Sequence, residues 1–163
     1  MSLLVRWLTV AVLLAQPGEV IDRVLAIVAG DVIAQSDVRL ARDLQLVAVE
    51  PGSDPTRAIL TALIERALVL AEVERYAPPE PPAGDIDGRL QAIRARFPTQ
   101  EAFEAALNQG GIDDSHLRER LRHDLRIEAY FAERFPPTGR DALVRDWIAG
   151  LRRRTDVIDL YKP

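Results

Sequence analysis

The sequence contains no cysteine, only two histidines, and few aromatic side chains, which make up 6% of its 163 residues. Without cysteine the chain can form neither disulfides nor thiolate metal sites, and it offers no thiol nucleophile. The net charge of -4 argues against nucleic acid as the main ligand, because phosphate binding requires a positive field. Hydrophobic residues still account for 48% of the chain, which is enough for one compact domain with its own core.

Patterns of catalytic or metal-binding residues are also scarce. His116 and His123 fall on one expected helix, separated by about 10.5 Å along its axis, which is too far for them to share a metal ion. Ser36, Ser53 and Ser115 lie at expected turns or caps, and none sits in a nucleophile elbow. No glycine-rich phosphate loop follows a strand. We therefore expect no catalytic residues, no metal and no cofactor, and a protein that is not an enzyme.

The N-terminus has the pattern of an export signal. Arg6 precedes a short apolar stretch at residues 8–15, and Gln16-Pro17-Gly18 would break a helix. The stretch is too short to span a hydrocarbon layer about 30 Å thick. We predict a signal peptide at residues 1–16 and a periplasmic domain at 17–163, with no stable membrane insertion once the signal is removed. A buried first helix and an uncleaved membrane anchor are the alternatives.

Both ends of the predicted domain favour β-structure. Residues 19–35 are rich in β-branched and apolar side chains on either side of Ala29-Gly30-Asp31, which predicts a β-hairpin. Gly30 can adopt the positive φ that a tight turn needs. Residues 157–161 predict a closing strand that pairs with the hairpin. Because both faces of the hairpin look apolar, we expect helices to cover the sheet.

Between these strands, apolar residues recur with helical periodicity, and the fold class is therefore mainly α with a small β-sheet. Asp54 followed by Pro55 is typical of a helix start. The stretch from Pro78 to Pro82 predicts a stiff connector. Trp147 is expected to pack the last helix against the hairpin. The six expected helices run from Ser36 to Glu50, Pro55 to Tyr76, Asp85 to Phe97, Thr99 to Gly110, Asp113 or Asp114 to Phe135, and from a Thr138 cap through Leu151.

Several stretches resemble, in the same order, the SurA-, PpiD- and PrsA-related chaperones. Residues 20–38 are similar to the family's hairpin and capped first helix, and residues 62–70 to its second helix. Residues 99–122 resemble its "T-x-x-x-F-x-x-x-L-x-x-x-G-I…L-R…L" pattern, and Trp147-Ile148 with residues 154–160 resemble the final helix and strand. The resemblance implies a SurA N-terminal-like, ATP-independent periplasmic chaperone module.

One departure from the family changes the functional expectation. The family usually inserts parvulin-type prolyl isomerase domains before the closing helix and strand, whereas here residues 135–138 span that gap directly. Prolyl isomerase activity is therefore not implied. The resemblance implies binding of unfolded polypeptide clients, outer-membrane proteins among them. The alternatives are a structural or interaction subunit of an envelope complex and, ranked lower, a peptidyl-prolyl isomerase.

Client binding by such a module requires apolar side chains that line grooves. The candidate residues share a large apolar or aromatic side chain at the expected helices, with ordinary core packing as the alternative explanation for each. They are Leu46, Phe97, Phe103, Tyr130 and Phe131.

Overall fold

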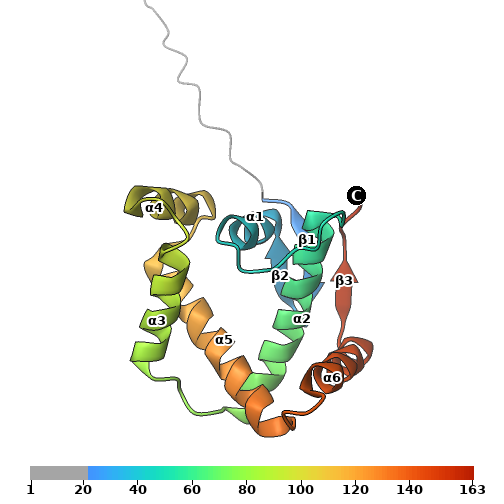
Figure 1. Ribbon diagram of the computed structural model, residues 1–163. Helices are drawn as coiled ribbons and strands as arrows, with labels where there is room; N and C mark the ends of the chain where they lie inside the picture. The colour runs from blue at the N-terminus through green and yellow to red at the C-terminus, as the bar shows by residue number, and fades with distance from the viewer. Residues whose placement is uncertain (1–21) are drawn as a thin grey trace, which may run out of the picture.

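The computed structural model describes residues 22–163, and the predicted signal peptide lies outside these residues. The described chain is mainly α, as expected, with six helices and one three-stranded sheet (Figure 1). The elements in chain order are β1 (Val24–Val28), β2 (Asp31–Ala34), α1 (Gln35–Asp43), α2 (Pro55–Tyr76), α3 (Ala83–Arg94), α4 (Gln100–Gln109), α5 (Asp114–Arg134), α6 (Arg140–Arg154) and β3 (Val157–Asp159).

The sheet joins the two ends of the described chain. Its strand order is β2-β1-β3 with antiparallel pairing throughout, which confirms that the C-terminal strand completes the hairpin. Ala29 (φ 52°) and Gly30 (φ 97°) both adopt left-handed conformations, as a two-residue turn matching the strand twist requires. The Ala29 amide donates to the Asp156 carbonyl at 3.0 Å, so the turn also contacts the start of β3.

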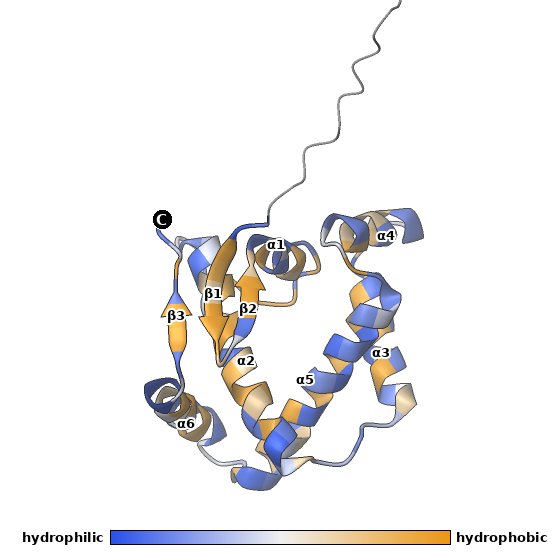
Figure 2. Ribbon diagram, turned by 180° about the vertical axis from the view of Figure 1, so that it is seen from behind, coloured by the Kyte–Doolittle hydropathy of each residue, from blue (hydrophilic) through white to orange (hydrophobic). Residues whose placement is uncertain are grey.

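Within residues 22–163 helices cover only one face of this sheet, whereas helical cover of both apolar faces was expected. Helix α2 contacts β1 and β2 from one side. On the other side Ile27 lies opposite Val32 and Ile158, which are 55% and 44% exposed. Figure 2 shows this apolar face of the strands with no helix in front of it. The other helices pack mainly against α2 and one another, so none is left to cover the outer face.

Helix α2 lies at the centre of the fold. The Asp54 carboxylate accepts hydrogen bonds from the amides of Thr56 (2.9 Å) and Arg57 (3.1 Å), and Pro55 occupies the first helical position, as predicted. The proximal core combines the sheet, α2 and parts of α1, α5 and α6. Its members on α2 are Ile59, Leu60, Leu63, Ile64, Leu68, Val69 and Val73.

A second cluster, the distal core, packs α1 against α3, α4 and the first half of α5. Leu46 contacts both cores and joins them. The buried residues of the distal core are Leu40, Leu44, Leu90, Ile93, Phe103, Ala106, Leu107, Leu117 and Leu121.

Helix α1 ends at Asp43, not at Glu50 as the apolar spacing indicated. Gln45 adopts a left-handed conformation (φ 53°), its amide donates to the Arg42 carbonyl at 3.0 Å, and the Leu46 amide donates to the Ala41 carbonyl at 2.8 Å. This pair of bonds is a Schellman motif, which normally carries glycine at the position of Gln45. The motif turns the chain so that Leu46 reaches both cores.

Two predicted caps also differ. Helix α1 begins one residue before Ser36, with Ala34 as its N-cap, and the Asp37 carboxylate accepts from the Ala34 amide at 2.8 Å. The Ser36 hydroxyl instead donates to Asp22. Helix α6 begins after Gly139, whose φ of 73° turns the chain, and Thr138 makes no capping hydrogen bond.

Candidate functional site

A cavity of about 410 Å³ lies between α2, α3, α5 and the turn that follows α1. Figure 1 shows α2 and α5 meeting at one end and diverging towards α1. The volume falls in the range of about 300–1,000 Å³ typical of ligand sites. Its apolar lining is aliphatic throughout and consists of Leu46, Val47, Ala62, Leu63, Ala92, Ile93 and Leu121. Its polar lining consists of Gln45, Arg66, Arg89, Arg96, Arg120 and Asp124. We call this space the central cavity.

A smaller cavity of about 250 Å³ lies on the β2 side of the same helices. The two cavities share Leu63, Arg66 and Arg120, so these side chains contribute to both linings. The smaller cavity is more acidic, because its lining adds Asp31, Asp37 and Glu74.

Arg66 is held along α5 by two hydrogen bonds. Its Nε donates to Asp124 Oδ1 at 2.6 Å and its Nη2 donates to the Arg120 carbonyl at 3.2 Å. The Arg120 side chain lies beside this pair, and its buried Nε has no hydrogen-bond partner among residues 22–163. Burial, followed by the neighbouring Arg66, lowers the pKa of the Arg120 guanidinium, while Asp124 and Asp37 act in the opposite direction.

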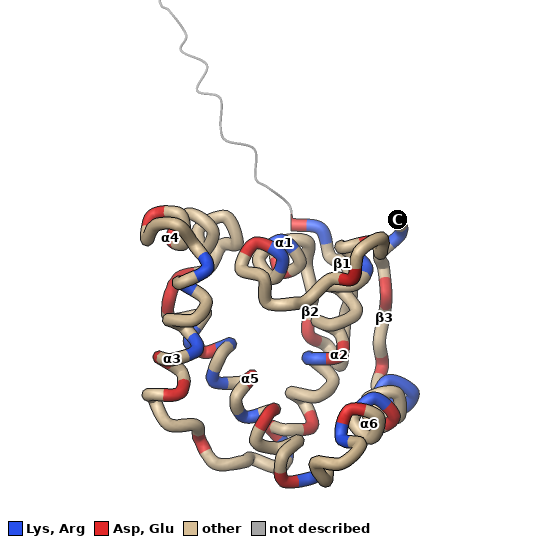
Figure 3. Tube along the Cα trace, in the orientation of Figure 1, with Lys and Arg blue, Asp and Glu red and all other residues tan. Residues whose placement is uncertain are grey.

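The other two arginines of the lining have different partners. Arg89 forms an ion pair with Glu128 at 2.5 Å. Arg96 Nη1 donates to the carbonyls of Gln45 (2.8 Å) and Leu44 (3.3 Å), and so satisfies the end of α1. Within the described part of the chain, Arg96 and Arg120 are therefore the two lining arginines without a carboxylate in ion-pair contact. Figure 3 shows basic and acidic positions interspersed along α2, α3 and α5.

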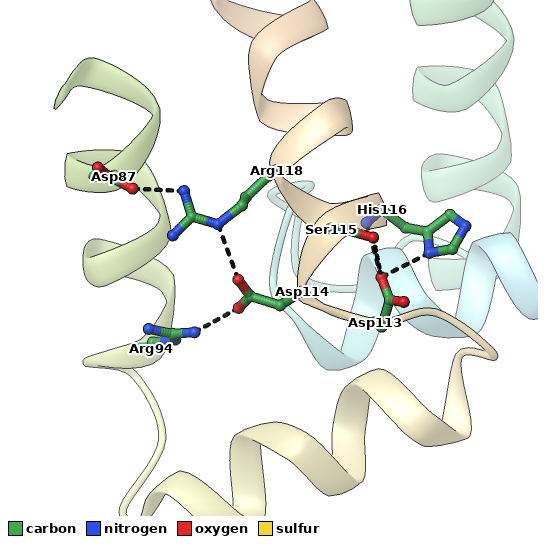
Figure 4. Close-up of polar contacts among 7 residues, drawn as sticks. All are labelled: Asp87, Arg94, Asp113, Asp114, Ser115, His116 and Arg118. Carbon is green, nitrogen blue, oxygen red and sulfur yellow. Dashed lines mark hydrogen bonds and ion pairs between the residues drawn. The ribbon is translucent and has the colours of Figure 1, made fainter. Parts of the chain in front are cut away.

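Ion pairs hold α3 against α5 and so position one wall of the cavity (Figure 4). Arg118 on α5 donates from Nη1 to Asp87 on α3 at 2.5 Å and from Nε to Asp114 at 2.9 Å, and Asp114 also pairs with Arg94. The Arg118–Asp87 pair is exposed and contributes about 0–1 kcal/mol, while the Arg94–Asp114 pair is partly buried. The wall is therefore fixed by several weak contacts together with the distal core.

The five predicted client-binding residues do not come together. Leu46 lines the central cavity. Phe103 is only 1% exposed in the distal core, where its ring meets that of Phe97 edge-on at 5.6 Å. Tyr130 is only 5% exposed in the proximal core, and the half-buried Phe131 lines a separate cavity of about 300 Å³.

Tyr130 and Phe131 belong instead to an aromatic cluster where α5 meets α6. Trp147 contacts both rings and Phe135, at centroid distances of 5.7 to 5.9 Å. The aromatic neighbours of Trp147 thus lie on α5 and at its C-cap, and Trp147 packs against the proximal core, to which the hairpin also contributes. The Arg134 guanidinium stacks over four rings of this region, which are those of Tyr76, Tyr130, Phe135 and Trp147.

Sequence reasoning missed Arg66 and Arg120, because basic and acidic residues at helical spacing are typical of a solvated surface.

No group of three or more His, Cys, Asp or Glu residues in the described range is arranged to hold a metal ion. No helix within residues 22–163 is both long and apolar enough to cross a membrane. The sequence matches no protein-family model and no curated protein, so the functional assignment depends on the fold and on the central cavity.

Proposed function

We propose that this protein is a periplasmic, ATP-independent chaperone-like module that binds extended segments of unfolded polypeptides, including outer-membrane proteins, and that it performs no catalysis. The observation that carries the proposal is the central cavity. It presents aliphatic side chains to an incoming chain, among them the half-buried Leu46 and Val47, and its volume of about 410 Å³ suits a short stretch of peptide.

The way the cavity is built supports weak and reversible binding. A chaperone without ATP must release its client without an external energy source, so its contacts have to be modest. The α3 wall is attached to α5 by exposed ion pairs such as Arg118 with Asp87, and the turn at Leu46 joins the two cores. These exposed ion pairs can exchange for water at low cost in free energy, while Leu90 and Ile93 keep α3 in place through the distal core.

The sequence supports the location and the absence of catalysis. The pattern of residues 1–16 favours export, and the order of the matching stretches resembles the periplasmic chaperone family. The hydroxyls of Ser36, Ser53 and Ser115 each donate to a neighbouring oxygen, and none of them donates to a histidine that could act as a general base.

Light scattering by an aggregating client tests this proposal. A denatured outer-membrane β-barrel is diluted into buffer with or without the purified protein, and an unrelated soluble, aggregation-prone protein serves as the second client. We expect suppression of barrel aggregation near stoichiometric ratios. No effect on either client would contradict the proposal. Capture of a single tight-binding envelope protein, without suppression, would favour the interaction-subunit alternative.

A pair of variants links the effect to the cavity. Ala92 is exposed on α3 and lines the central cavity, so Ala92→Trp fills the cavity without disturbing either core. Ala105 is exposed on α4 and lines no cavity described above, so Ala105→Trp adds the same side chain elsewhere. We expect only Ala92→Trp to lose suppression while both variants keep the wild-type melting temperature. Equal suppression by both variants would show that clients bind outside this cavity.

A further inference from the structure

We infer that the central cavity selects client segments in which an acidic side chain stands between aliphatic ones, and that the Arg120 guanidinium binds its carboxylate. This inference rests on the proposed function and names the class of segment that the cavity prefers. It follows from the charge of the lining, the position of Arg120 and the aliphatic surface around it.

The lining of the central cavity is basic in a chain that is acidic overall. Four arginines and one aspartate line it, although the whole chain carries a net charge of -4. Asp124 is occupied by Arg66, and Arg89 is paired with Glu128. The positive charge that is left in this lining lies on Arg96 and Arg120.

Arg120 is the better placed of these two to bind a carboxylate. Arg96 already donates to carbonyls at the end of α1, whereas the buried Nε of Arg120 has no acceptor among residues 22–163. A planar guanidinium favours a carboxylate that accepts two parallel hydrogen bonds. Partial burial strengthens such a bond because water competes less for the charged groups. Arg96 adds positive potential at the same cavity.

The aliphatic lining defines the residues on either side of the carboxylate. Leu63, Ile93 and Leu121 face the same cavity as Arg120. An acidic side chain alone would leave this surface uncovered, and an aliphatic segment alone would leave the Arg120 guanidinium without an acceptor. A segment that combines both satisfies the two requirements together. A basic segment would instead bring a like charge beside Arg96 and Arg120.

Fluorescence anisotropy with three capped peptides tests the inference. The peptides share one aliphatic sequence and differ only at a central residue, which is Glu, Gln or Lys, and their ends are acetylated and amidated so that only side chains carry charge. We expect the Glu peptide to bind about tenfold more tightly than the Gln peptide, as one ion-assisted hydrogen bond allows, and the Lys peptide to bind most weakly.

Variants assign the preference to a residue. Arg120→Gln should remove the preference for Glu over Gln, and Arg120→Lys should restore only part of it. Arg96→Gln should reduce the preference, because it removes a positive charge from the same cavity. Arg145→Gln removes one exposed charge on α6, away from both cavities, and should change nothing. Thermal melting establishes that each variant is folded.

The possible outcomes separate the inference from the proposed function. Equal affinity for the Glu and Gln peptides would overturn the inference and leave peptide binding intact. Absence of binding by all three peptides would overturn both. A preference for Glu that survives Arg120→Gln but falls with Arg145→Gln would reflect general surface charge, and would also overturn the assignment to Arg120.

Discussion

The Tyr161 hydroxyl donates a hydrogen bond to Asp54 Oδ2 at 2.9 Å, although the two residues are 107 positions apart. The same aspartate caps α2 through its other oxygen. Arg57, in the first turn of α2, stacks on the Tyr161 ring at 4.6 Å and donates to Asp159 at 2.5 Å. The C-terminal strand and tail are therefore attached to the start of the central helix as well as to β1.

Deletion of residues 155–163 should unfold the domain. The deletion removes β3 and its pairing with β1, together with the contacts that Arg57 and Asp54 make to the tail. A lone two-stranded hairpin is marginally stable in water. Circular dichroism should show no cooperative thermal transition in the truncated chain.

Tyr161→Phe is the control. It should lower the melting temperature only slightly, because the hydrogen bond that it removes is exposed to solvent. A cooperative transition in the truncated chain would contradict the prediction.

Two glycine-to-alanine substitutions should have opposite effects on stability. At Gly110 an added Cβ would lie 3.1 Å from the Cβ of Leu40 and closer still to its Cδ1, within the distal core. We expect Gly110→Ala to destabilise the protein by about 1–3 kcal/mol through overpacking. At Gly88, in α3, an added Cβ meets nothing within 4 Å. Gly88→Ala should stabilise by about 0.5–1 kcal/mol. Urea unfolding measures both, and a Gly110→Ala variant as stable as the wild type would show that the packing at Leu40 is looser than described.

Asp113 should make the stability depend on pH in the acid range. The Ser115 hydroxyl (2.6 Å), the His116 amide (3.0 Å) and the His116 ring hold the pKa of Asp113 well below its usual range. A carboxyl group with a depressed pKa in the folded state stabilises the protein above its unfolded pKa of about 3.9, and this stabilisation is lost as the pH falls through the folded value.

Asp113→Asn tests this dependence, because asparagine also caps helices but does not titrate. The wild type should melt at a higher temperature than the variant at neutral pH, and the difference should shrink progressively below about pH 4. Melting curves from neutral to strongly acidic pH measure it. A difference that stays constant over this range would show that the charge of Asp113 does not contribute.

Tyr130 combines a buried ring with a hydroxyl that has no partner among the described residues. Tyr130→Phe keeps the ring contacts with Tyr76 and Trp147 and removes the unpartnered hydroxyl. We expect it to be neutral or slightly stabilising. Tyr130→Ala should cost about 3–5 kcal/mol, as loss of a large buried aromatic ring does. Equilibrium unfolding in urea compares them. A marked loss of stability in Tyr130→Phe would show that the hydroxyl is hydrogen-bonded in solution.

Elements with local signals were predictable from sequence. Asp54 and Pro55 mark the start of α2, and Thr99 caps α4, where its hydroxyl accepts from the Ala102 amide at 3.2 Å. The end of α1 has no such signal, since Gln45 occupies a left-handed position that usually carries glycine. Burial of Leu40 and Leu44 in the distal core accompanies this conformation, and such tertiary contacts cannot be deduced from residue spacing.

The candidate site was less predictable than the fold for a related reason. Arg120 and Asp124 stand at a helical spacing that is typical of a solvated surface. Only the placement of α2 opposite α5 brings Arg66 between them and encloses Arg120. Phe103 and Tyr130 were candidates because of their size, and the structure uses both in its cores. Each of them also borders a cavity other than the central one, so core packing and cavity lining do not exclude one another.

The strand order β2-β1-β3 also determines when the protein can finish folding. The first strand of the sheet lies in its middle, and one of its two neighbours is the last strand of the chain. While the chain is being synthesised, one edge of β1 stays unpaired until residue 159 has emerged. A chain stopped before that point would display an open strand edge beside the apolar Ile27 and Val32, and it would itself be a substrate for chaperones.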